Sequence, residues 1–171
     1  TGMATLEEVG QALEQLEKVQ TVAILHCVTQ YPARDEEANL RAIQTMAAGC
    51  GLPVGYSDHT LGIEVALAAV ALGACLIEKH LTLDRALPGP DHKASLEPDE
   101  FAALVRGVRM VESALGHGRK EPTPREANTA QVARKSLVAA RDISAGLRLT
   151  EELITIKRPG TGLPPSMLPN V

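Results

Sequence analysis

Apolar and polar residues along the first two thirds of the chain predict helices and short buried strands in alternation. Apolar residues recur at helical spacing in four segments, and three short apolar runs are typical of buried strands. The predicted helices cover residues 5–19, 36–50, 61–72 and 98–115, and the predicted strands cover residues 21–28, 53–57 and 74–79. Short buried strands that alternate with helices indicate βαβ units and a parallel sheet. The sequence therefore predicts an α/β fold.

The number of predicted strands is too small for a closed barrel. A (β/α)₈ barrel needs about 250 residues, and three strands do not close one. The chain also opens with a helix, Thr5 being its candidate N-cap, that has no strand before it. We therefore expect the chain to be a fragment of a longer protein.

The amino-acid composition changes after Leu115. Residues 116–128 are rich in glycine, proline and charge, as linkers are. Residues 134–140 and 153–157 resemble strands, and residues 142–146 resemble a turn. These features predict a small β-rich second domain of about 40 residues, a length that is marginal for independent folding. We expect this domain to be truncated as well.

Composition excludes several classes of protein. The 171 residues carry 17 Lys and Arg against 21 Asp and Glu, a net charge of −4, and 44% are hydrophobic. Such a chain has no basic excess for nucleic-acid binding, and its apolar content is too high for intrinsic disorder. No apolar run reaches the roughly 18–20 residues of a membrane span, and the N-terminus lacks the features of a signal peptide.

The three cysteines point to a reducing compartment. Cys27, Cys50 and Cys75 are odd in number, and their spacing fits neither a zinc site nor a secreted disulfide framework. We interpret them as reduced small hydrophobic residues of a cytoplasmic protein.

Polar clusters follow all three predicted strands. They are His26–Cys27 with Thr29–Tyr31, then Ser57–His59, and then Glu78–His80. Functional groups of parallel α/β sheets gather at the carboxyl ends of the strands. Two histidines at the ends of neighbouring strands are able to converge on one divalent metal ion. The alternative is that each histidine satisfies a local backbone group.

A long loop adds a second candidate region. Residues 83–98 include two prolines around a glycine, followed by Asp91, and long loops at a catalytic rim often bind ligands. The alternative is a solvated loop. Glu78 and Asp91 are candidate acid–base or orienting carboxylates. Because neighbouring strand residues point to opposite faces, we expect Glu78 to share a face with His80 rather than with Lys79.

Taken together, these motifs resemble the sialic acid synthase family, whose members make N-acetylneuraminate, legionaminate and pseudaminate. The resemblance covers residues 1 to about 162 and is carried by the motifs LHCVTQYP, GLPVGYSDHTLGIEVALAAVALGA, IEKHLTLDRALPGPDHKASLEPDE, ARKSLVAARDISAG and TIKRPGTG. It implies that residues 1–117 are the C-terminal portion of a (β/α)₈ TIM barrel. Residues 118–133 are then a linker, and residues 134–171 begin a truncated antifreeze-like (SAF) domain.

The resemblance also implies a reaction. The family condenses phosphoenolpyruvate with an N-acylated aldose (N-acetylmannosamine or its 2,4-diacetamido analogue) and releases phosphate, which makes it a carbon–carbon bond-forming transferase. It depends on a divalent metal ion, Mn²⁺ with Mg²⁺ as the alternative, and it forms a domain-swapped homodimer. The implied roles are Glu78 at the reacting carbons, Gln30, Tyr31, Ser57, Asp91 and Arg158 at the substrates, and His59 and His80 at the metal.

Two features keep other readings open. Gln30 replaces an Asn that is common in N-acetylneuraminate-making members, and CVTQYP resembles the legionaminate branch. The family's N-terminal strands carry a glutamate, a threonine and lysines that are absent from this chain, so we expect no synthase activity from the chain alone. The alternative is a non-catalytic piece that mediates assembly, and a metal-dependent aldolase is a third reading.

Overall fold

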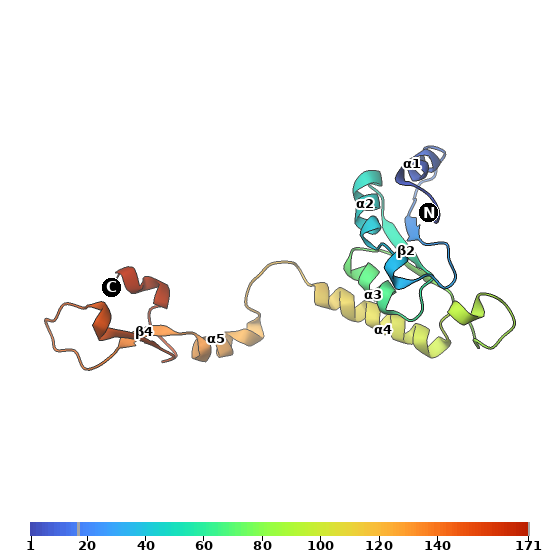
Figure 1. Cartoon of the computed structure of the whole chain (residues 1–171). Helices are drawn as coiled ribbons and strands as arrows, with labels where there is room; N and C mark the ends of the chain where they lie inside the picture. Colours follow the sequence, from blue (N-terminus) through green and yellow to red (C-terminus); the bar gives the residue numbers. More distant parts are fainter. Residues whose placement is uncertain (17, 171) are drawn as a thin grey trace. The chain divides into compact units, whose positions relative to one another are not determined.

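The computed structural model describes residues 1–16 and 18–170, which divide into two units, Thr1–Gly118 and Arg119–Val171 (Figure 1). Each unit has its own small sheet. In the part of the chain that the structure describes, no helix is both long and apolar enough to span a lipid bilayer.

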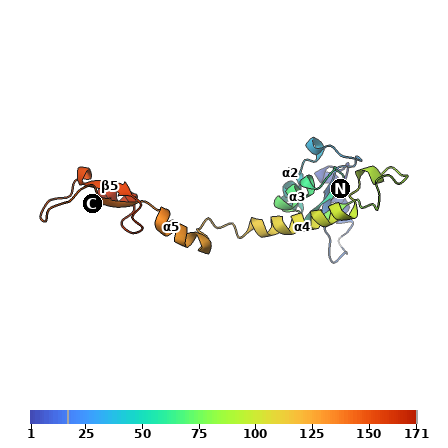
Figure 2. The same cartoon turned by 90° about the horizontal axis from the view of Figure 1, so that it is seen from below.

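The first unit is a parallel α/β structure. Its three strands are hydrogen-bonded in the order β1-β2-β3, and both pairings are parallel, as the sequence predicts. Helices α3 and α4 lie side by side in both views (Figures 1 and 2). The elements are α1 (Leu6–Glu14), β1 (Ile24–Cys27), α2 (Arg41–Cys50), β2 (Val54–Asp58), α3 (Glu64–Ala71), β3 (Ile77–Lys79) and α4 (Pro98–Leu115), with 3-10 turns at Asp35–Glu37 and His92–Ala94.

Helix α1 begins where the sequence predicts but ends early. The Thr5 hydroxyl accepts from the Glu8 backbone N–H, and the Thr5 backbone N–H donates to the Glu8 carboxylate at 2.7 Å, a capping box. These bonds from the Thr5 backbone and hydroxyl lower the pKa of Glu8. After Glu14 the backbone tightens, since the Leu16 N–H bonds to the carbonyl of Leu13. The predicted end at residue 19 was therefore too long; residue 17 lies outside the described residues.

The helix predicted over residues 36–50 is split into a 3-10 turn and α2, whereas the helix predicted over residues 98–115 forms with these bounds as α4. Asn39 has φ 44°, a left-handed conformation that Asn tolerates, and it separates the 3-10 turn from α2. Gly51, with φ 63°, ends α2. Helix α4 has Pro98 in its first turn, and the side chains of Glu97 and Glu100 form a capping box there.

Strand β2 is the buried centre of the first unit. Val54 and Tyr56 pack in one core cluster with residues of α1, α2 and α3. On the other face, a Cβ at Gly55 would lie 2.6 Å from the carbonyl oxygen of Leu76 and would also meet the side chain of Leu25. Only glycine lets β1 and β3 approach β2 this closely. The core cluster comprises Val9, Ile24, Ile43, Met46, Val54, Tyr56, Ala69 and Ala74.

The second unit contains an antiparallel pair, β4 (Ser136–Ala139) with β5 (Ile154–Lys157). The segment before it, predicted as a linker over 118–133, includes helix α5 (Ala127–Ala133). A capping box between Thr123 and Glu126, with Pro124 next to the cap, starts this helical stretch. Short 3-10 turns cover Pro124–Glu126, Glu151–Leu153 and Pro165–Asn170.

All three cysteines of the chain lie in the first unit and are free thiols.

Tyr56 is the one fully buried aromatic ring of the described core, and its hydroxyl has no hydrogen-bond partner among the described residues. Burial, together with the negative charge of nearby Asp58, raises its pKa above the usual value near 10. The hydroxyl is therefore protonated in the folded protein even where a free tyrosine ionises.

We expect Tyr56→Phe to raise the free energy of unfolding by about 1 kcal/mol at neutral pH, because it removes an unpaired buried hydroxyl. In the wild type, the unfolded tyrosine ionises above about pH 10 while the folded one stays protonated, so stability falls as the pH rises past 10. Tyr56→Phe is expected to lessen this fall. Urea unfolding from pH 7 to 11 measures both effects, and a variant less stable than the wild type would contradict the unpaired hydroxyl.

Candidate functional site

A row of three side chains crosses the parallel sheet at its carboxyl end. The strand register pairs Cys27 with Ser57 and Ser57 with Glu78. Side chains alternate along a strand, so this row lies on the face opposite Tyr56 and the helices. Three segments distant in sequence therefore present polar groups at one place.

This row forms the floor of a cavity of about 280 Å³. Five of the residues that the sequence singled out line it together, from three different strand ends. Its lining residues are Thr1, Leu25, Cys27, Tyr31, Ser57, His59, Glu78 and His80.

His59 and His80 meet at the rim of this cavity. Each lies two residues beyond a member of the row, Ser57 or Glu78, and so on the same face. Their ring centroids are 5.3 Å apart with the planes at 79°. The ring of Tyr31 packs over His59 at a centroid distance of 4.1 Å and meets His80 at 5.4 Å. The three rings form one aromatic cluster, with Tyr31 half exposed and His59 buried.

The hydrogen bond of His59 fixes which of its nitrogens is free. Its Nδ1 lies 2.8 Å from the carbonyl oxygen of Val28, and because a carbonyl only accepts, Nδ1 carries the proton. The Cys27 Sγ lies 3.8 Å from the same nitrogen. The Nε2 atom of neutral His59 then has its lone pair available, the arrangement usual for a metal-binding imidazole held by a backbone carbonyl.

Two imidazoles at this distance suit a divalent ion with open coordination positions. Nitrogen ligands from His59 and His80 are chemically appropriate for such an ion. Across the residues that the structure describes, no group of three or more His, Cys, Asp or Glu side chains is arranged to hold a metal.

Ser57 and Glu78 are joined directly. The buried Ser57 hydroxyl donates to Oε1 of the exposed Glu78 carboxylate at 2.6 Å. A hydroxyl has only one proton to donate, so this bond competes with donation to a substrate phosphate. In this structure the Ser57 hydroxyl orients the Glu78 carboxylate at the floor of the cavity.

The charged residues between the site residues point the other way. Asp58 and Lys79 form an ion pair of 2.8 Å, and both side chains are fully buried. Lys79 is therefore not the partner of Glu78, as strand alternation predicts. The Asp58 carboxylate also accepts the Thr60 backbone N–H at 2.9 Å.

Three predicted substrate residues lie outside the cavity lining. Gln30 is exposed next to Tyr31, and Asp91 is exposed in the long loop just before the His92–Ala94 turn. Arg158 follows β5 in the second unit and is also exposed. The roles of these three residues stay predictions.

The long loop is held at its base by Arg85. The Arg85 guanidinium donates to the carbonyl of Ser95 at 3.0 Å and pairs with Glu100 at the start of α4. The hydroxyl of Thr82, the residue before the loop, lies 2.8 Å from His92 Nδ1. Asp91 is thus carried on an anchored loop.

The sequence places Cys27 in the first polar cluster but assigns it no role, although its thiol shares a row with Ser57 and Glu78. The signal was present in the alternation of β1, since Cys27 follows His26 at the end of that strand. His26 faces the other side, where its Nε2 lies 2.8 Å from the carbonyl oxygen of Ala38. It is therefore a structural histidine.

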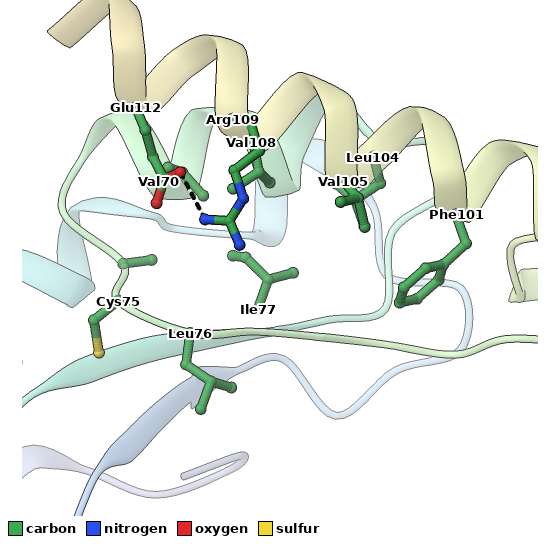
Figure 3. A pocket seen from close by; sticks show the side chains of 11 residues that line it. Val70, Cys75, Leu76, Ile77, Phe101, Leu104, Val105, Val108, Arg109 and Glu112 are labelled. Atoms are coloured by element: carbon green, nitrogen blue, oxygen red, sulfur yellow. Dashed lines mark hydrogen bonds and ion pairs between the residues drawn. The ribbon is translucent and has the colours of Figure 1, made fainter.

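A second cavity, of about 230 Å³, lies between α4 and β3 (Figure 3). Phe101, Val105 and Val108 of α4 face Leu76 and Ile77 across it. The charged groups at this cavity are Arg109 and Glu112, which are paired with each other at 2.7 Å. This groove is apolar and offers no acid–base or metal-ligand constellation.

Comparisons with known proteins match both units. The NeuB family model matches residues 1–120, and the SAF domain model matches residues 134–170. An N,N'-diacetyllegionaminic acid synthase from Campylobacter jejuni is 49% identical over 95% of this chain and 50% of its own length. One of the same name from Legionella pneumophila is 44% identical over all of this chain and 50% of its own. The chain thus spans about half the length of these relatives.

A solved structure agrees with this match. The N-acetylneuraminic acid (sialic acid) synthetase of Leptospira borgpetersenii superposes with a TM-score of 0.68 at 45% identity. The superposition covers 73% of this chain and 44% of that one.

Because the ring of Tyr31 packs over His59, removing it is expected to change the NMR chemical shifts of the His59 ring. We expect Tyr31→Ala to move the ring-proton NMR signals of His59 downfield, because the shielding by the stacked ring is lost. The signals of His26, which contacts Tyr56 rather than Tyr31, serve as the control. Unmoved His59 signals would show that the two rings do not stack in solution.

Proposed function

The chain belongs to the NeuB family, and we propose that it forms part of the active site of a nonulosonic (sialic) acid synthase. The reaction joins phosphoenolpyruvate to an N-acylated aldose, consumes a water molecule and releases phosphate. The observation that carries this proposal is the single cavity lined by Ser57, His59, Glu78 and His80. The relatives named as synthases of legionaminic and sialic acids support the product class.

We further propose that residues 1–117 form the last part of a (β/α)₈ barrel and that residues 134–171 begin its SAF domain. Strands β1 and β3 are at the edges of the three-stranded sheet. Unpaired edges of a parallel sheet favour further strands. The apolar groove beside β3 (Figure 3) offers a surface for a further barrel element.

In the proposed reaction, the C2=C3 π pair of phosphoenolpyruvate attacks the aldehyde carbon of the open-chain sugar through C3, which leaves an oxocarbenium ion at C2, and the aldehyde oxygen takes a proton from solvent water. A divalent ion held by His59 and His80, Mn²⁺ with Mg²⁺ as the alternative, supplies Lewis-acid polarisation of that aldehyde when bound. Water then adds at C2, and the tetrahedral intermediate collapses to a ketone as phosphate leaves. The electron pairs and the oxygen atoms balance without any further reactant.

Glu78 is the proposed base of the second step. Its carboxylate accepts one proton of the attacking water and passes it to the departing phosphate, while the C2 hydroxyl loses its remaining proton to solvent as the ketone forms. The Ser57 hydroxyl, 2.6 Å from Oε1, keeps the carboxylate in one orientation. Tyr31 packs against both imidazoles and so keeps bulk water from that side of the cavity.

For the substrate we propose the 2,4-diacetamido aldose, because the relatives from Campylobacter jejuni and Legionella pneumophila are named as N,N'-diacetyllegionaminic acid synthases. Gln30, Asp91 and Arg158 are the proposed contacts to the sugar and to phosphoenolpyruvate. Arg158 belongs to the second unit, and we propose that it serves the other protomer of a domain-swapped homodimer in the cytoplasm.

The test of this function is a phosphate-release assay with the full-length protein, phosphoenolpyruvate and Mn²⁺. We expect release with the 2,4-diacetamido aldose, less with N-acetylmannosamine, and none from residues 1–171 alone. Preference for N-acetylmannosamine would overturn only the substrate assignment. Silence of the full-length protein with both sugars would favour the non-catalytic assembly role.

Replacing Glu78 by Gln in the full-length protein is expected to lower kcat about 10²–10⁴-fold with little change in KM. The amide keeps the shape of the side chain but cannot take a proton at neutral pH. Steady-state phosphate release measures both constants, and turnover within a factor of two of wild type would remove Glu78 from the mechanism.

Ser57→Ala, measured in the same assay, distinguishes two roles of the Ser57 hydroxyl. If the hydroxyl orients Glu78, kcat falls while the KM for phosphoenolpyruvate stays near the wild-type value. A rise confined to that KM would instead assign Ser57 to the phosphate, the role implied by the family resemblance.

A further inference from the structure

We propose that the buried ion pair between Asp58 and Lys79 is a positioning device that sets the distance between His59 and His80. This inference rests on the proposed function for the role of the two imidazoles as metal ligands. It assigns the two charged residues to the helical face of the sheet, away from substrate. They act on the site through the backbone alone.

Both charged groups of the pair are buried and hydrogen-bonded. The Lys79 Nζ donates to Oδ2 of Asp58 at 2.8 Å, and both side chains are completely inaccessible. The other carboxylate oxygen, Oδ1, accepts the backbone N–H of Thr60 at 2.9 Å and its hydroxyl at 2.7 Å. Lys79 Nζ also donates to the carbonyl of Thr60 at 2.5 Å. The network therefore holds Thr60 from both its N–H and its carbonyl.

The position of the pair links it to both histidines. Asp58 directly precedes His59, Lys79 directly precedes His80, and Asp58 and Lys79 are register partners. This is the last paired row of β2 and β3, so no strand pairing between them restrains the two histidines. With Thr60 held as well, His59 is flanked on both sides by residues of the network. The ion pair is thus the last tie between β2 and β3 before the imidazoles.

Stability alone does not account for such a pair. Removing two charges from water costs as much as their attraction returns, and well-packed neutral residues of similar volume are often as stabilising. A charged pair gives instead a directional link of fixed length between two strands. That link is what a two-histidine site needs, because its ligands come from different strands and a shift in either one changes their spacing.

The test is the double variant Asp58→Asn with Lys79→Met in the full-length protein. It removes both charges together, while the new Asn can still accept from the N–H of Thr60. The control removes the exposed ion pair of α4 by Arg109→Met with Glu112→Gln. Three quantities are measured: the melting temperature, the Mn²⁺ dissociation constant from the EPR signal of free Mn²⁺, and the NOE between the His59 and His80 rings in metal-free protein.

We expect the double variant to fold, to bind Mn²⁺ about 10–100-fold more weakly, and to lose the inter-ring NOE. The control is expected to keep the wild-type affinity and NOE. A folded double variant with wild-type affinity and NOE overturns the proposal.

Two other results are covered: a double variant that does not fold, and a wild-type protein that binds no Mn²⁺. If the double variant does not fold, Lys79→Arg keeps both charges but changes the length of the link, and an unchanged affinity and NOE in it would overturn the proposal. If the wild type binds no Mn²⁺, the metal of the proposed function is wrong. The NOE comparison, made without metal, still decides whether Asp58 and Lys79 position the rings.

Discussion

The parallel register between β2 and β3 is the constraint on which the site depends. It pairs Ser57 with Glu78, and alternation then carries His59 and His80 to the same face. A slip of one residue would turn every one of these side chains toward the helices. The burial of Tyr56 beneath α2 and α3 opposes that slip, because the large ring fits only on the helical side.

The sheet separates its charges by face. On the helical side the ion pair of β2 and β3 is buried and hydrogen-bonded, as a charge away from water must be. On the open side the exposed Glu78 carboxylate accepts the Ser57 hydroxyl. The groove between α4 and β3 is lined mainly by apolar side chains and is suited to packing.

The amino-acid pattern alone determined the parallel α/β unit, the bounds of helix α4 and the two histidines at neighbouring strand ends. These features are local or periodic. Helix ends follow from caps such as Pro98 and Gly51, and the face of a strand residue follows from its parity. The same parity argument placed Glu78 with His80 and separated it from Lys79. The family resemblance added the expected roles, which periodicity does not contain.

Other features were decided only by the tertiary structure. The stacking of Tyr31 on His59 and the partner of Lys79 depend on contacts between segments far apart in the chain. Cys27 joined the site only through its register with Ser57. A sequence pattern states which face a residue occupies but not which residue lies beside it, because that neighbour is set by strand order and by the packing of helices against the sheet.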